Sequence, residues 1–69
     1  MKVTLNGKSH EFEANSGDLT ITAFVSGLDL GNQPVLVELN GEAVLAREFD
    51  THYLSDGDTI EVIRMVAGG

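Results

Sequence analysis

Apolar and polar residues alternate at the beginning of the chain. Val3 and Leu5 are separated by polar neighbours, and a second alternating stretch covers residues 9–14. Asn6-Gly7 lies between the two stretches, and this dipeptide accepts the positive φ angles of a type I′ turn. The pattern therefore predicts a β-hairpin at the start of the chain.

The spacing of the apolar residues then changes to that of an α-helix. After a turn cluster at 15–18, apolar residues fall at positions i, i+3, i+4 and i+7, which form one helical face: Ile21, Phe24, Val25 and Leu28. Thr20 is the expected N-cap, Gly27 weakens the last turn, and residues 31–34 end the element. We expect a helix of about 8 to 10 residues.

The second half of the chain predicts three more strands. Residues 35–39 are rich in β-branched side chains, and a second Asn-Gly dipeptide follows them at Asn40-Gly41. The remaining elements are expected in this order: a partner strand at 42–45, a short helical turn within 47–53, a turn at 55–58 and a final strand at 59–66.

These elements occur in the order β-β-α-β-β-β. Two hairpins separated by one helix and closed by a last strand form the β-grasp arrangement, an α+β fold in which one main helix packs on one face of a mixed sheet of four to five strands. The chain has 69 residues, too few for a second core. We expect one β-grasp domain over residues 1–65 and a flexible tail at 66–69.

Successive side chains of a strand point to opposite faces, so the last two long strands each present an inner and an outer row. We expect Ile60 and Val62 to face the helix, together with the odd-numbered positions of 35–39. The open face then carries an apolar patch beside the tail, with charged residues around it. The expected partner-binding residues are Leu36, Glu38, Glu61, Ile63, Arg64 and Met65. The alternative is that these are ordinary scattered surface residues.

The charge balance limits the choice of partners. Eleven acidic residues stand against four basic ones, which repels phosphate backbones and anionic lipid, so neither nucleic acid nor a membrane is expected as a partner. The acidity serves solubility, or it steers the protein toward a basic docking surface. No apolar run of signal-peptide or membrane-spanning length is present, so we expect a cytoplasmic protein.

Residues that could carry chemistry are few. The chain has no cysteine, which excludes disulfides and thiolate metal sites. His10 and His52 lie far apart, without a paired nucleophile or metal-ligand spacing, and are expected to be solvated surface residues. Asp56 and Asp58 flank a glycine, but the further ligands of a calcium loop are missing, so turn chemistry is expected. We expect no catalytic residue, no metal, and no phosphate-binding loop for ATP.

The last four residues, 66–69, are the exception. They are Val66, Ala67, Gly68 and Gly69, and in an extended conformation they reach about 13 to 14 Å. Two glycines without Cβ atoms can thread a narrow channel and leave the carbonyl carbon of Gly69 unshielded. A carboxylate is a poor electrophile, so its activation must come from a partner. The protein is expected to be a carrier that serves as a co-substrate, not an enzyme.

Three segments together resemble the ThiS-type sulfur carriers of thiamine biosynthesis. They are 37–44 (VELNGEAV) with Arg47, 54–62 (LSDGDTIEV), and the terminal VAGG. The resemblance implies a ubiquitin-like fold whose Gly69 is adenylated with ATP by an E1-like, ThiF-type adenylyltransferase. A sulfur donor such as a cysteine desulfurase then yields a thiocarboxylate. This thiocarboxylate supplies sulfur to a ThiG-type thiazole synthase, and the carrier itself holds no cofactor.

Other proteins of the same fold remain possible from the sequence. The small subunit of molybdopterin synthase shares fold and tail, although its members are usually somewhat longer. A ubiquitin-like protein modifier and a non-catalytic β-grasp interaction domain with an accidental Gly-Gly are the further alternatives. The sequence alone does not choose the sulfur-using pathway.

Overall fold

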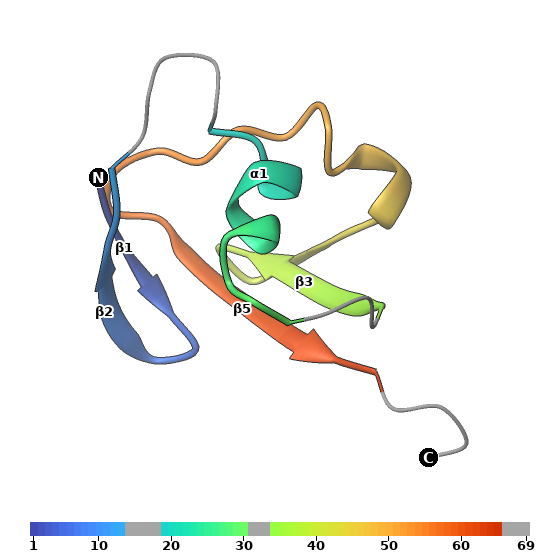
Figure 1. Ribbon diagram of the computed structural model, residues 1–69, viewed down its shortest axis with the longest axis horizontal. Helices are drawn as coiled ribbons and strands as arrows, with labels where there is room; N and C mark the ends of the chain where they lie inside the picture. Colours follow the sequence, from blue (N-terminus) through green and yellow to red (C-terminus); the bar gives the residue numbers. More distant parts are fainter. Residues whose placement is uncertain (14–18, 31–33, 66–69) are drawn as a thin grey trace.

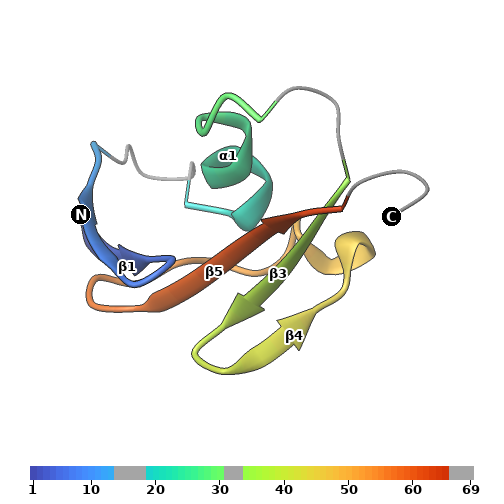
Figure 2. The same ribbon diagram turned by 90° about the horizontal axis from the view of Figure 1, so that it is seen from below.

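Five strands form one mixed sheet in the order β2-β1-β5-β3-β4, and one helix crosses a single face of it (Figures 1 and 2). The computed structural model describes residues 1–13, 19–30 and 34–65. The elements are β1 (Lys2–Leu5), β2 (Lys8–Glu11), α1 (Ile21–Ser26), β3 (Val35–Leu39), β4 (Glu42–Val44), the 3₁₀ turn η1 (Ala46–Glu48) and β5 (Thr59–Arg64). The predicted β-grasp fold is confirmed.

β5, the last strand along the chain, occupies the centre of the sheet. It pairs in parallel with β1 and antiparallel with β3 over the full length of β3. β2 and β4 are the edge strands, each joined to its neighbour through an antiparallel hairpin. Within the sheet, β5 therefore lies between the two hairpins.

Both hairpins turn at the Asn-Gly dipeptides that the sequence indicates. Asn6 and Gly7 have φ angles of 50° and 86°, and Asn40 and Gly41 have 51° and 86°. Two successive positive φ angles define a type I′ turn, whose twist matches that of the flanking strands. The turns of both hairpins were thus correctly predicted, but two strand boundaries differ. β2 covers Lys8–Glu11 rather than 9–14, and β4 ends one residue earlier than expected.

The helix is shorter than predicted. α1 spans six residues rather than 8 to 10, and its C-cap is Gly27. Leu28 follows in a turn, donating its N–H to the carbonyl of Val25 at 3.0 Å, and Asp29 has a positive φ of 58°. A left-handed residue cannot continue a right-handed helix, so the element stops there. Leu28 nevertheless packs against the core, as its spacing predicts.

The first turn of α1 leaves no backbone N–H without a partner. Ala23 N–H donates to Oγ1 of Thr20 at 3.2 Å, which confirms Thr20 as the N-cap. Two other N–H groups donate to carbonyls of the segment after β4: Ile21 to His52 at 3.0 Å and Thr22 to Phe49 at 3.3 Å. This segment, gold to orange in Figure 1, therefore covers the N-terminal end of the helix.

The core lies between α1 and the sheet and is entirely apolar. No polar or charged side chain is buried among the described residues. Ile60 and Val62 of β5 are buried, as the alternation predicts. Within the ranges that the structure describes, the buried apolar side chains are Val3, Ile21, Phe24, Val37, Val44, Leu54, Ile60 and Val62.

Three other predicted elements differ from the structure or fall outside it. The helical turn expected within 47–53 is a 3₁₀ turn that begins one residue earlier, at Ala46. β5 ends at Arg64 rather than at 66. The predicted turn at 15–18, most of 31–34 and the tail at 66–69 lie outside the described residues. No helix of the described ranges is long and apolar enough to cross a membrane.

A side-chain amide continues the parallel pairing of β1 with β5. The backbone N–H groups of Thr4 and Asn6 donate to the carbonyls of Asp58 and Ile60, at 2.9 and 3.0 Å. Where β1 then turns away, the amide of Asn6 replaces the backbone: Val62 N–H donates to Asn6 Oδ1 at 2.9 Å, and Asn6 Nδ2 donates to the Val62 carbonyl at 3.2 Å. Asn6 therefore adopts the positive φ that the turn requires and also hydrogen-bonds to the backbone of the central strand.

Replacing Asn6 with glycine tests this second role. Glycine keeps the positive φ of the turn but removes both bonds to Val62, so we expect Asn6→Gly to lower the free energy of unfolding by about 1 to 2 kcal/mol. Hydrogen exchange of the Val62 amide should accelerate. Asn40→Gly is the matched control, because it changes the equivalent position of the other turn and leaves Val62 untouched. Unchanged protection of Val62 in Asn6→Gly would contradict the assignment.

Candidate functional site

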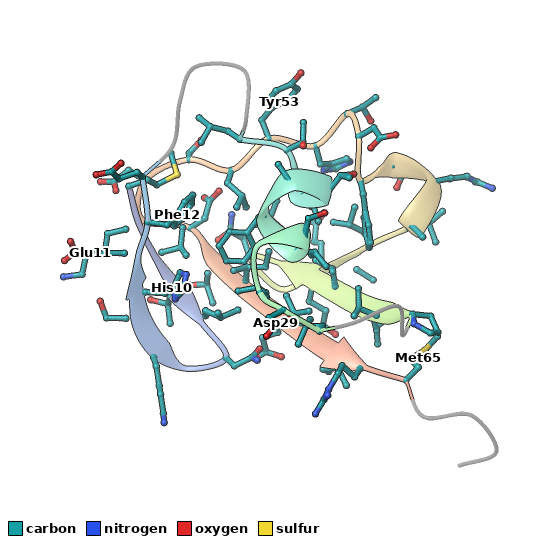
Figure 3. All side chains as sticks on the ribbon, viewed as in Figure 1. His10, Glu11, Phe12, Asp29, Tyr53 and Met65 are labelled. Atoms are coloured by element: carbon teal, nitrogen blue, oxygen red, sulfur yellow. The ribbon has the colours of Figure 1, made fainter. Side chains whose placement is uncertain are left out.

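The C-terminal end of β5 is held firmly against the start of β3. Arg64 pairs with Val35, and Met65 N–H donates to the carbonyl of Pro34 at 2.9 Å. Figure 3 shows Met65 where the strand leaves the sheet. The predicted attachment residue Gly69 and the other tail residues, 66–68, lie outside the described residues. They follow directly on Met65, so the sheet fixes the point from which they start.

An exposed apolar patch, formed by Leu36, Ile63 and Met65, leads to this point. Leu36 and Ile63 are direct cross-strand partners on β3 and β5. Their side chains are 43% and 48% exposed, and that of Met65 is 50% exposed. The alternation correctly predicts which face they occupy. Their role in binding a partner stays a prediction.

The charged residues expected around this patch do not all share its face. Glu38 and Glu61 are direct partners in the same register and lie on the open face. Arg64, by contrast, is opposite Val35. It lies two positions after Val62 along β5, so its side chain is on the same side as that of Val62, which faces the helix. The open face beside the patch is therefore acidic, and Arg64 borders it only at the end of the strand.

The expectation that His10 is a solvated surface residue is wrong. His10 is half-buried, and its ring lies 5.9 Å from that of Phe12 and 5.7 Å, edge to face, from that of Phe24 in α1 (Figure 3). The sequence contains a pattern that could have indicated this burial. The Asn-Gly turn sets the register of the hairpin, and this register pairs His10 with the buried residue Val3. His10 thus packs with the two phenyl rings, which lie 5.1 Å apart.

The same expectation is wrong for His52, which is also half-buried and whose backbone N–H donates to the carbonyl of Glu48 at 3.1 Å. The carbonyl of His52 accepts a hydrogen bond from the first N–H of α1. Two other exposed residues, Leu45 at 50% and Tyr53 at 59%, were not singled out from the sequence. They lie after β4, outside the strands that form the open face, so they do not extend the apolar patch.

The two aspartates around Gly57 stabilise a turn, as predicted. Asp58 accepts from the N–H of Ser55 at 2.8 Å, and Asp56 accepts from the N–H of Lys2 at 2.7 Å. Gly57 has a positive φ of 91°. Within the described residues, no group of three or more histidine and acidic side chains could hold a metal ion. Within the described residues, the structure therefore shows an exposed apolar patch beside a strand end that pairs with the sheet.

Comparison with protein families matches most of the chain to a known family. The model of the ThiS family matches residues 3–69. The fold is close to the crystal structure of a thiamine biosynthesis protein (ThiS) from Geobacter metallireducens, with a TM-score of 0.82 and 34% identity over all of both chains. The solution structure of a thiamine biosynthesis protein from the same organism has a TM-score of 0.80 and 34% identity, covering all of this chain and 88% of that one.

Curated relatives point in the same direction. The whole of this chain is similar to part of two proteins named thiazole synthase: that of Paramagnetospirillum magneticum is 30% identical and that of Magnetococcus marinus 33% identical, each over 69 residues. The chain spans about a fifth (20%) of the length of these relatives. The family match over residues 3–69 and the shared fold lead to one conclusion: the chain belongs to the ThiS family and has a β-grasp fold.

Proposed function

We propose that this protein is a sulfur carrier for the thiazole-forming branch of thiamine biosynthesis. The observation that carries the proposal is the family match, which extends over residues 3–69 and so includes the Gly-Gly segment. The likeness to a thiamine biosynthesis protein over the full length of both chains supports the same pathway. No observation on the described residues favours the other β-grasp functions.

The proposed chemistry takes place at the carboxylate of Gly69 and is catalysed by partners. The carboxylate attacks the α-phosphate of ATP on an E1-like, ThiF-type adenylyltransferase, and pyrophosphate leaves. The outer sulfur of a persulfide on a sulfur donor, such as a cysteine desulfurase, then attacks the carbonyl carbon, and AMP leaves. A thiol reductant cleaves the resulting acyl disulfide, which releases the thiocarboxylate and leaves the reductant in a disulfide with the cysteine of the donor. One sulfur replaces one oxygen, and the resulting thiocarboxylate delivers that sulfur to a ThiG-type thiazole synthase.

Two observations support a carrier whose chemistry is catalysed by partner enzymes. The absence of cysteine agrees with a route in which sulfur travels on the terminal carbonyl and needs no thiol in the carrier. Two proteins named thiazole synthase contain a stretch similar to the entire chain, which supports a thiazole synthase as the protein that accepts the sulfur. The adenylyltransferase docks on the open face of the sheet, through the apolar patch and its acidic neighbours.

The first test is the product itself. The protein is incubated with ATP, a ThiF-type adenylyltransferase, a sulfur donor and a thiol reductant, and its intact mass is measured. We expect a gain equal to the difference between one sulfur and one oxygen atom. Leaving out ATP is the control and should abolish the gain. An unchanged mass with the activating enzymes of both the thiamine and the molybdopterin pathways would refute a carrier role.

The second test changes the reacting residue. Gly69→Phe, or deletion of Gly69, should abolish ATP–pyrophosphate exchange, because a side chain shields the carbonyl or the reacting carboxylate is displaced. The fold should survive, since the buried core residues of the described ranges lie between positions 3 and 62. The melting temperature is the control measurement. A large drop in it would show that the changed end belongs to the folded body.

The third test probes the docking face. Ile63→Asp places a carboxylate in the centre of the apolar patch, so adenylation should slow by about tenfold through weaker binding of the adenylyltransferase. Ile63 is 48% exposed, so the free energy of unfolding should change by about 1 kcal/mol or less. Ser9→Asp is the control, because it adds the same charge to exposed β2, two strands away. If Ile63→Asp unfolds, or if it is adenylated at the wild-type rate, the open face is not the docking surface for the adenylyltransferase.

A further inference from the structure

Two carboxylates oppose each other directly on the open face of the sheet. Glu38 of β3 and Glu61 of β5 are cross-strand partners, and the other neighbour of Glu38, on β4, is the small residue Ala43. Directly opposed residues of antiparallel strands have Cβ atoms about 4.5 to 5.5 Å apart, and like charges in such pairs destabilise the sheet. This pair is therefore a local cost to folding.

Among the described residues, no cationic side chain hydrogen-bonds to this pair. None of the side-chain hydrogen bonds within the described residues involves Glu38 or Glu61. All four basic residues of the chain are described, and none is a cross-strand neighbour of the pair. They are Lys2 of β1, opposite Glu11, Lys8 of β2, Arg47 of η1, and Arg64 on the helix side of β5.

The acidic pair lies next to the apolar pair of the same two strands. Along β3 and β5, the pair Leu36–Ile63 is separated from Glu38–Glu61 only by Val37–Val62, which points to the core. One exposed surface thus has an apolar row and an anionic row side by side. A surface that binds this face must supply an apolar side chain for the first row and a positive charge for the second.

We propose that Glu38 and Glu61 together form the receptor for one arginine side chain of the activating enzyme. This inference rests on the proposed function, and it names the chemistry of the partner at the docking face. A guanidinium group is planar and presents five donors, so it can hydrogen-bond both carboxylates at once, whereas a lysine is a single point charge. The arginine relieves in the complex the repulsion that the free protein retains.

The proposal predicts opposite effects on stability and on activation. Neutralising either glutamate removes the like-charge pair, so the free protein becomes more stable. The same change removes half of the receptor, so association with the enzyme becomes slower and less dependent on salt. A purely structural role for either residue would not make the fold more stable and binding weaker at the same time.

The experiment compares the wild type with Glu38→Gln, Glu61→Gln and the double variant, using a ThiF-type adenylyltransferase from the same organism. Each single variant should melt about 2 to 4 °C higher than the wild type. The double variant should gain little more, because one substitution already removes the repulsion. The kcat/KM of ATP–pyrophosphate exchange should fall by about threefold to tenfold at low salt, with a shallower dependence on sodium chloride.

Glu11→Gln is the matched control. Glu11 is an exposed glutamate on β2, and its cross-strand partner is Lys2. Its neutralisation should not raise the melting temperature and should leave kcat/KM and the salt dependence unchanged. If both single variants show wild-type exchange kinetics, or if both melt at a lower temperature, the proposed arginine receptor is refuted while the carrier function stands. If the wild-type protein itself undergoes no ATP–pyrophosphate exchange, both the arginine receptor and the proposed carrier function are refuted.

Discussion

The central position of β5 is the constraint on which the rest of the structure depends. Its inner side chains, Ile60 and Val62, are buried under α1, and each of its long edges pairs with a strand from a different hairpin. The asparagines of both Asn-Gly turns bind its backbone, Asn6 at Val62 and Asn40 at Thr59. Because β5 is held on both sides, the residues that follow it start from a fixed point.

The two faces of the sheet obey different rules. The inner face is covered by α1, and the buried side chains of the described residues on it are all apolar, so it contributes stability. The outer face has no element of the described chain across it, and there the protein keeps exposed apolar side chains next to unneutralised charges. Neither feature helps the isolated domain, but both favour contact with a surface of complementary shape and charge. Because successive side chains of a strand point to opposite faces, the residues that stabilise the core and those available for binding lie on opposite sides of the sheet.

Local patterns predicted the strands and turns well, whereas features that depend on distant segments could not be read from the sequence. Asn-Gly turns and the run Val35–Leu39 specify their own conformation. The end of α1 also depends on Asp29, whose left-handed φ no periodicity reveals. The bond between Asn6 and Val62 requires the parallel register of β1 with β5, 56 positions apart. His10 was misjudged because its polarity outweighed its register opposite Val3.

The pairing of Leu36 with Ile63 also bears on quality control in the cell. Each strand contributes one residue to this pair, so neither hairpin displays it before β5 inserts between them. Insertion of β5 closes long sequence separations, which makes it a slow and late step of folding compared with the formation of the hairpins. A partner that recognises this pair therefore binds chains in which β5 has paired with β3. A chain that lacks this pairing does not present the binding surface, so no additional check of its folding is needed.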